Sequence, residues 1–135
     1  MLSTWLFVGF GEEVLFRGYF LKAFWRHFTA ETSKRRMLSA ALLVNVFFSL
    51  WHLPTRIASV LSGELDWLTL LISLVVLFLL GLGYTYLYIR SDNIFLVGLV
   101  HGLSDYPLVG KNTQVSLIIL LVAIGCVELY KRLKK

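Results

Sequence analysis

The chain has 135 residues, of which 58% are hydrophobic, with a mean hydropathy of +0.77 and a formal net charge of +5. Soluble domains are about 45–50% apolar, and the excess here lies in long uncharged runs, which excludes an ordinary soluble domain and predicts an integral membrane protein. The positive charge does not indicate nucleic-acid binding, because no soluble part of the sequence would present it to a nucleic acid.

Five apolar segments follow one another along the chain, and a helix needs about 20 residues to span the hydrocarbon core. In order, the segments cover residues 2–21, 37–55, 67–89, 94–110 and 112–127. The third has no charged residue, and the fourth carries only Asp105. The sequence therefore predicts an all-α fold, a polytopic integral membrane helical bundle of about five transmembrane helices, in a single domain over residues 1–135.

The basic residues fall mainly on one side of this arrangement. Because the chain would cross the membrane five times, the connection at 22–36, the turn at Arg90 and the tail at 128–135 share a side. That side holds most of the lysines and arginines, so the positive-inside rule makes it cytoplasmic.

The first apolar segment carries the pattern E-E-x-x-x-R, formed by Glu12, Glu13 and Arg17. On a helix, Glu13 and Arg17 are four residues apart with the acid first, which favours an ion pair. Glu12 points about 100° away from Glu13. We therefore expect Glu13 to neutralise Arg17 and Glu12 to face a cavity, where a carboxylate can act as a general base. The alternative is a structural ion pair near a helix end, with Glu12 in water.

The second apolar segment contains F-S-L-W-H, from Phe48 to His52. Pro54 should end this helix, since proline donates no backbone hydrogen bond and disfavours helix just before it. His52 is a candidate for activating water or binding a metal ion. A histidine beside Trp51 is also typical of the aromatic belt at a membrane surface, and this alternative stays open.

The fourth segment contains His101 and Asp105, which lie on one helix face because they are four residues apart. Asp105 can orient His101 by accepting its ring N–H, or both can hold a metal ion or a reacting oxygen. A hydrogen-bonded pair that only joins helices is the alternative. Gly98 and Gly102 bracket His101, and small residues at this spacing predict close packing against another helix. Glycine is, however, common in membrane helices.

Ionisable groups are costly in hydrocarbon, so they usually face a bundle interior or a wet cavity and have a function there. Glu12, His52, His101 and Asp105 come from three different segments. At about 1.5 Å per residue from the cytoplasmic helix ends, their depths fall within about a third of the bilayer thickness. Modest helix tilts would therefore let them surround one cavity.

Taken together, the three motifs resemble the CAAX-protease and bacteriocin-processing (CPBP) family of intramembrane endopeptidases, which is similar to type II CAAX prenyl endopeptidases. The sequence supplies EEVLFR at 12–17, FSLWH at 48–52 and HGLSD at 101–105, in the order and on the helices typical of that family. The likeness extends over about residues 11–106. We expect this chain to lack N-terminal helices that longer members of the family have.

The resemblance implies an endopeptidase whose site lies within the membrane. Glu12 and His52 would activate the attacking water, while His101 and Asp105 would stabilise the developing oxyanion or complete a metal site. The supporting residues would be Glu13 and Arg17. Many members have asparagine at the position of Asp105, and an ionised aspartate would repel an oxyanion unless its charge is offset.

Asp105 is easier to understand as a metal ligand or as the group that orients His101. The metal ligands, if a metal is bound, would be Glu12, His52, His101 and Asp105, which satisfy zinc on ligand type alone. The sequence lacks the H-E-x-x-H pattern of many zinc peptidases. The cofactor is therefore left open, with zinc as the candidate.

The function expected is hydrolysis of a peptide bond by a CAAX-protease-like intramembrane (metallo)endopeptidase, through a water activated by glutamate and histidine. Its partners would be a peptide or protein substrate in or at the membrane and the lipid bilayer, with no nucleic acid. The expected location is the bacterial plasma membrane, with the 22–36 connection and the C-terminal tail cytoplasmic. The charge bias then places His52 toward the outer face, whereas processing of prenylated C-termini needs a cytoplasmic opening.

Two alternative functions keep the same residues. One is a non-catalytic bacteriocin-immunity or scaffold membrane protein of the same family. The other is a small proton-coupled transporter subunit, in which a glutamate within the membrane binds protons or a cationic substrate. The second is disfavoured because the sequence shows no inverted repeat.

Overall fold

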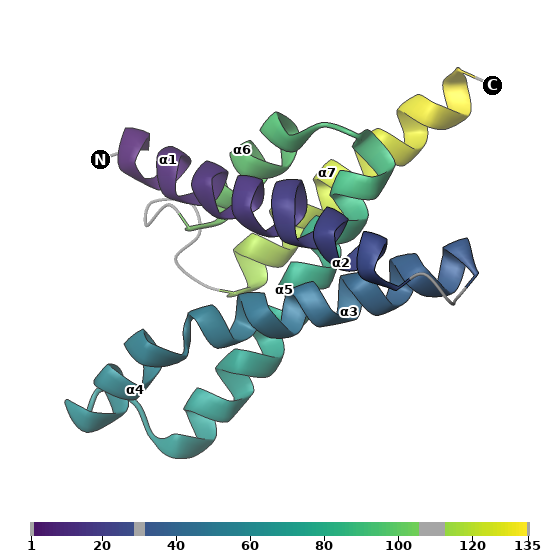
Figure 1. The fold of residues 1–135 in the computed structure, drawn as a ribbon. Coiled ribbons are helices and arrows are strands. Elements are labelled where there is room, and N and C mark those ends of the chain that lie inside the picture. Colours follow the sequence, from purple (N-terminus) through teal and green to yellow (C-terminus); the bar gives the residue numbers. More distant parts are fainter. Residues whose placement is uncertain (1, 29–31, 106–112, 135) are drawn as a thin grey trace. The chain divides into compact units, whose positions relative to one another are not determined.

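The computed structural model describes residues 2–28, 32–105 and 113–134, and every regular element in these ranges is a helix (Figure 1). The helices are α1 (Leu2–Glu13), the π-helical η1 (Val14–Phe20), α2 (Leu21–His27), α3 (Ser33–Trp51), α4 (Leu53–Leu61), α5 (Trp67–Ser91), α6 (Ile94–Asp105) and α7 (Thr113–Leu133). The all-α fold class predicted from the apolar segments is confirmed.

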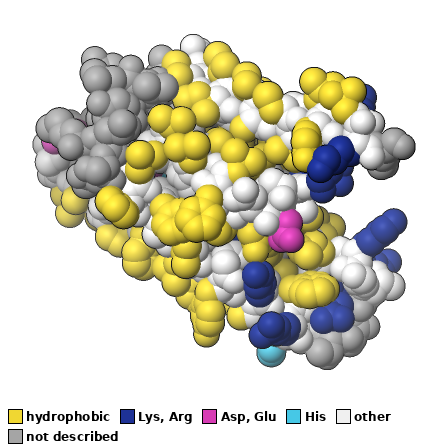
Figure 2. Space-filling model, turned by 90° about the horizontal axis from the view of Figure 1, so that it is seen from above, with side chains coloured by type: hydrophobic (Ala, Val, Ile, Leu, Met, Phe, Trp, Pro, Cys, Tyr) yellow, Lys and Arg dark blue, Asp and Glu magenta, His cyan; other side chains and the backbone are white. Residues whose placement is uncertain are grey.

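Three stretches of the described chain are long and apolar enough to cross a membrane, judged by length and composition. They are Ser33–Leu61, Trp67–Ser91 and Gln114–Leu133, which correspond to the second, third and fifth predicted segments. The helix Ile94–Asp105 is apolar but shorter. Hydrophobic side chains also cover much of the face seen in Figure 2, as expected of helices that face lipid.

The first two predicted helices differ in detail from those observed. The first is not a single α-helix, because α1 ends at Glu13, the π-helical η1 follows, and α2 continues to His27. The second ends at Trp51, but the chain is helical again from Leu53, since a proline in the first turn of a helix has no intrahelical hydrogen bond to lose. Residues 106–110, the end of the predicted fourth helix, lie outside the described residues.

The chain divides into two compact units. Unit 1 consists of Met1–Phe20 and Gly83–Lys135, and unit 2 consists of Leu21–Leu82. Unit 1 therefore holds α1, η1, α6, α7 and the end of α5, while unit 2 holds α2, α3, α4 and the beginning of α5. The single domain expected from the sequence stays a prediction.

In unit 1, α1 and α6 approach so closely that both need glycine at the contact. A Cβ atom added to Gly9 would lie 2.6 Å from the backbone nitrogen of Gly102 and 2.8 Å from its Cα. A Cβ atom added to Gly98 would lie 3.0 Å from the Cα of Phe10. The close packing predicted for Gly98 and Gly102 is therefore present, and Gly9 is the partner that the pattern did not identify.

Replacing Gly9 by alanine is expected to lower the free energy of unfolding by about 1–3 kcal/mol, because the added methyl group forces α1 away from α6. Gly11 is the matched control, since it lies on the same helix and a Cβ atom there meets nothing within 4 Å. Gly11→Ala should keep or slightly raise stability, because alanine favours helix more than glycine does. Unfolding in detergent, followed by circular dichroism, measures both variants, and equal midpoints would contradict the close packing.

In unit 2, α3 contacts both α2 and α5. The rings of Phe24 and Phe47 stack with their centroids 5.7 Å apart, which joins α2 to α3. The hydroxyl of Ser49 donates a hydrogen bond to the carbonyl oxygen of Leu74 at 2.7 Å, which joins α3 to α5. These contacts fix the helix that carries the F-x-x-x-H motif.

The N-terminus of α5 is capped by Asp66. Its carboxylate accepts hydrogen bonds from the backbone N–H of Thr69 at 2.7 Å and from the Thr69 hydroxyl at 2.9 Å. These bonds, the backbone one first, hold the pKa of Asp66 below its usual value. The cap is therefore fully formed at neutral pH, and its contribution to stability is lost as the pH falls through the lowered pKa.

Candidate active site

A group of ionisable side chains surrounds His101 inside unit 1. Nδ1 of His101 lies 2.8 Å from Oε1 of Glu13, and Nε2 lies 3.2 Å from Oδ2 of Asp105 and 3.8 Å from Oε2 of Glu12. The side chains of His101 and Glu13 are 4% and 0% exposed, whereas those of Glu12 and Asp105 are 18% and 39% exposed. These four residues and Arg17 are called the His101 cluster below. Three of the four predicted catalytic residues, Glu12, His101 and Asp105, are thus neighbours, together with both predicted supporting residues.

Glu13 links the imidazole ring of His101 to a buried guanidinium group. Its Oε1 accepts a hydrogen bond from Nη1 of Arg17 at 3.0 Å and also faces His101. Arg17 donates from Nε to the hydroxyl of Thr85 at 3.4 Å. The predicted ion pair between Glu13 and Arg17 is therefore present, and the contact of Glu13 with His101 is additional. Donation from Nδ1–H to the Glu13 carboxylate would fix the orientation of the ring.

Tyr84 holds the face of the His101 ring. The two ring centroids are 4.7 Å apart, the planes differ by 22°, and Tyr84 is buried. The guanidinium group of Arg17 lies over the same tyrosine ring, 5.7 Å from its centroid. Tyr84 and Thr85 come from the apolar segment 67–89 and were not among the predicted site residues. The sequence feature that could have identified them is a pair of neighbouring polar side chains within an otherwise apolar, uncharged span.

The change from α-helix to π-helix falls directly after Glu13. The π-helical segment Val14–Phe20 includes Arg17, and both Phe16 and Arg17 are buried in it. π-helical turns have i→i+5 hydrogen bonds and are frequent at functional sites. Hydropathy carries no information about hydrogen-bond register, so the apolar pattern could not indicate this turn.

Two carboxylate oxygens of the His101 cluster are buried without a hydrogen-bond partner among the described residues. They are Oε2 of Glu12 and Oε2 of Glu13. Buried carboxylate oxygens normally accept a hydrogen bond from protein or from ordered water. Oε2 of Glu12 also faces Nε2 of His101, at a distance too long for a direct hydrogen bond. The side chain of Glu12 is 18% exposed and that of Glu13 is 0% exposed, so Glu12 is the more accessible of these two carboxylates.

His52 lies in unit 2, at the junction between α3 and α4. Its Nδ1 is 2.9 Å from the carbonyl oxygen of Phe48, so Nδ1 carries a proton and the neutral ring has an unprotonated Nε2. The rings of Phe48 and His52 also meet edge to face, with centroids 5.0 Å apart. The F-x-x-x-H spacing therefore sets a tautomer that can accept a proton at Nε2. The joint action of His52 with Glu12 stays a prediction.

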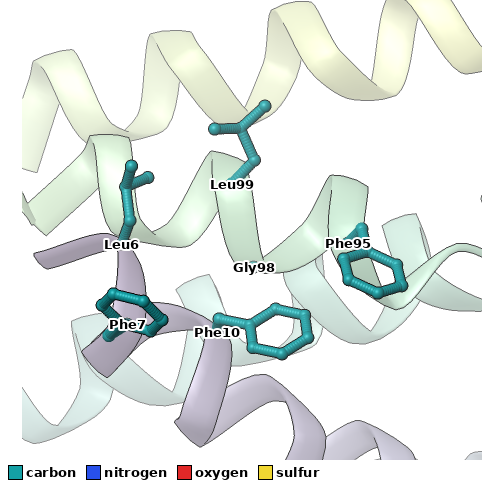
Figure 3. Close-up of a pocket in the computed structure, with 6 residues that line it drawn as sticks. All are labelled: Leu6, Phe7, Phe10, Phe95, Gly98 and Leu99. Carbon is teal, nitrogen blue, oxygen red and sulfur yellow. The ribbon is translucent and has the colours of Figure 1, made fainter. Parts of the chain in front are cut away.

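The two helices that carry most of the His101 cluster also form an apolar groove (Figure 3). The groove has a volume of about 400 Å³ and is lined by Leu6, Phe7, Phe10, Phe95, Gly98 and Leu99. The rings of Phe10 and Phe95 stack with centroids 5.1 Å apart. Because none of the lining side chains is polar, the groove suits a hydrocarbon chain rather than a charged group.

Among the described residues of unit 1, the predicted metal ligands Glu12, His101 and Asp105 are not arranged as a metal centre, and a contribution from His52 stays a prediction. Within residues 2–28, 32–105 and 113–134, no group of three or more His, Cys, Asp or Glu side chains is arranged to hold a metal ion. Nδ1 of His101 is engaged with Glu13, and its Nε2 faces the carboxylates of Asp105 and Glu12. The geometry therefore fits hydrogen bonding around the ring, and no zinc ligation follows from it.

The fold and the site together define a helical integral membrane protein with a buried cluster of acids around a histidine. The family model described as type II CAAX prenyl endopeptidase Rce1-like matches residues 1–107, and the chain belongs to this family. The resemblance inferred from the three motifs is confirmed, and the protein is thus a member of a membrane protease family. The match includes the whole His101 cluster and His52. No curated protein and no solved structure matches the chain.

Proposed function

We propose that the protein is an intramembrane endopeptidase that cleaves a peptide bond with a water molecule activated by Glu12 and His52. One observation carries the proposal. Oε2 of Glu12 is buried, accepts no hydrogen bond from the described residues, and faces Nε2 of His101, in a chain of the Rce1-like family. A base beside a potential donor is the arrangement that peptide hydrolysis requires.

Glu12 acts as the general base in this mechanism. A water molecule donates to its Oε2 and loses the proton as the water oxygen forms a bond to the carbonyl carbon of the substrate. The unprotonated Nε2 of His52 provides a second acceptor for the water. The proton is then passed to the amide nitrogen, and the carbon–nitrogen bond breaks to release the amine. General base catalysis of this kind contributes about 10²–10⁴-fold to the rate.

His101 stabilises the negative charge that develops on the carbonyl oxygen. In its doubly protonated form the ring donates through Nδ1 to Glu13 and through Nε2 to the oxyanion. Glu13 and Tyr84 hold the ring in place before the reaction, which is the condition for effective electrostatic stabilisation. Asp105 accepts from Nε2 in the resting state and releases this hydrogen bond to the oxyanion, so that its charge is offset by His101.

A lipid-modified peptide is the substrate class that we propose. The family description refers to CAAX prenyl endopeptidases, which act on a peptide that carries a hydrocarbon chain. The apolar groove on α1 and α6 supports this substrate, because it provides a hydrocarbon surface on the same two helices as Glu12 and His101. The prenyl chain would lie in the groove while the peptide bond reaches the polar cluster.

The test uses the full chain in liposomes with a prenylated CAAX peptide and the same peptide without the prenyl group, and mass spectrometry detects the products. We expect cleavage of the prenylated peptide, and its loss in His52→Ala and His101→Ala with membrane insertion unchanged. Full activity of both variants would overturn the proposed site. Binding of the peptide without cleavage would favour the scaffold alternative, and pH-dependent flux without cleavage would favour the transporter.

A further inference from the structure

The helix α4 differs from its neighbours because none of its residues is buried. Its apolar side chains recur on one helical face at Leu53, Ile57, Val60 and Leu61. The opposite face carries the polar side chains of Thr55 and Ser59, and Arg56 lies at the boundary between the two faces. An amphipathic helix of this kind needs an apolar surface to cover one face, and unit 2 covers the apolar side chains of α4 only in part, since none of them is buried.

The helix α4 follows α3 within the candidate membrane span Ser33–Leu61 and precedes the candidate span that begins at Trp67 (Figure 1). The preceding helix α3 has 19 residues, which extend about 28 Å at about 1.5 Å per residue and so approach the thickness of the hydrocarbon core. The first turn of α3 is basic, with Lys34, Arg35 and Arg36. The membrane crossing is therefore complete by the end of α3, and α4 is not needed for it.

Tryptophan residues mark both sides of the connection that contains α4. Trp51 is the last residue of α3 and is 58% exposed, and Trp67 is the first residue of α5 and is 61% exposed. Tryptophan is enriched where membrane helices meet the lipid headgroups. Two exposed tryptophans that flank a short connection therefore place the whole connection at the level of the membrane surface.

We infer that α4 is an interfacial helix, which lies among the lipid headgroups with its apolar face toward the acyl chains and holds His52 at the boundary between water and hydrocarbon. The partner of this surface is the bilayer itself. Arg56, at the boundary between the two faces of the helix, lies where a guanidinium group can meet lipid phosphates. A short amphipathic helix with few apolar residues binds weakly by itself, but the two flanking spans hold it at the surface.

The depth of His52 follows from the position of α4, because His52 is the residue that joins α3 to α4. The carbonyl oxygen of His52 accepts hydrogen bonds from the backbone N–H of Arg56 at 3.2 Å and from the Thr55 hydroxyl at 2.8 Å. These bonds tie His52 directly to the first turn of α4. Water would then reach His52 from the aqueous phase on this side of the membrane. That consequence rests on the proposed function, whereas the position of α4 does not.

The test uses the full chain in liposomes, in a Cys126→Ser background because Cys126 is the single cysteine of the chain. Ile57→Cys on the apolar face and Ser59→Cys on the polar face are each labelled with a fluorophore. The fluorescence is quenched in separate experiments by iodide, which stays in the water, and by nitroxide-labelled lipids. The nitroxide is placed either near the headgroup or deep in the acyl chain, so each quencher reports a different depth. We expect shallow nitroxide to dominate at position 57 and iodide to dominate at position 59, each by several-fold.

Leu79→Cys is the matched control for depth, since Leu79 is exposed on the span α5 and should be quenched most by the deep nitroxide. Strong iodide quenching at both α4 positions would overturn the inference by showing that the helix leaves the bilayer. Deep nitroxide quenching at both would overturn it by showing that α4 extends the span of α3. Val60→Cys and Thr55→Cys repeat the comparison if either first variant loses helicity. None of these measurements depends on peptide cleavage, so the position of α4 is tested independently of the proposed function.

Discussion

Replacing Glu12 by glutamine is expected to slow peptide cleavage by about 10²–10⁴-fold while leaving the fold intact. The amide has the shape of the carboxylic acid but cannot accept a proton from water. Little stability should be lost, because Oε2 of Glu12 has no hydrogen-bond partner among the described residues and the side chain is 18% exposed. Initial rates on the prenylated peptide in liposomes, and unfolding midpoints in detergent, measure the two effects separately.

Glu64 provides the matched control for the loss of a carboxylate. It is exposed in the connection between α4 and α5, where it accepts a hydrogen bond from the Ser59 hydroxyl at 3.2 Å. Glu64→Gln should change neither the rate nor the midpoint. A Glu12→Gln variant with the wild-type rate would remove Glu12 from the mechanism. A slower variant whose midpoint falls as well would give Glu12 a structural role instead.

The helices could be predicted from the sequence because an apolar run long enough to cross the bilayer is a local property. The apolar run at 67–89 shows this most clearly, since α5 covers Trp67–Ser91. Local reasoning failed where backbone hydrogen bonding decides the outcome. Neither the π-helical turn at Val14–Phe20 nor the renewed helix after His52 is visible in hydropathy, because both depend on which carbonyl each N–H meets.

The candidate site was predictable to the extent that its contacts lie within one helix. Glu13 with Arg17 and His101 with Asp105 are each four residues apart, and both pairs are in contact. The contact of Glu13 with His101 joins residues that are 88 positions apart. It depends on how closely two helices pack, which Gly9 and its partner glycine permit, and no spacing rule within one helix could supply it.

Breaking the buried pair of Glu13 and Arg17 is expected to lower the free energy of unfolding by about 3–5 kcal/mol, in either Glu13→Gln or Arg17→Met. Both side chains are 0% exposed and their charged atoms are 3.0 Å apart, so each single change leaves a buried charge facing a neutral group. The double variant removes both charges and keeps similar volume. Its loss in free energy of unfolding should therefore be smaller than the sum of the two single-variant losses, and the difference should be about 1–3 kcal/mol. The amide oxygen introduced at position 13 can still accept from Nδ1–H of His101.

Arg90 and Glu128 form the matched control, an ion pair between α5 and α7 of the same unit whose side chains are 38% and 28% exposed. An ion pair between partly solvated charges contributes little to the free energy of unfolding. Glu128→Gln and Arg90→Met should therefore destabilise the protein far less than the changes at Glu13 and Arg17, and their effects should be nearly additive. Unfolding midpoints of both sets of single and double variants in the same detergent give the comparison. Additive losses at Glu13 and Arg17 would contradict the proposed network, because Glu13 would then hold His101 without help from the guanidinium group.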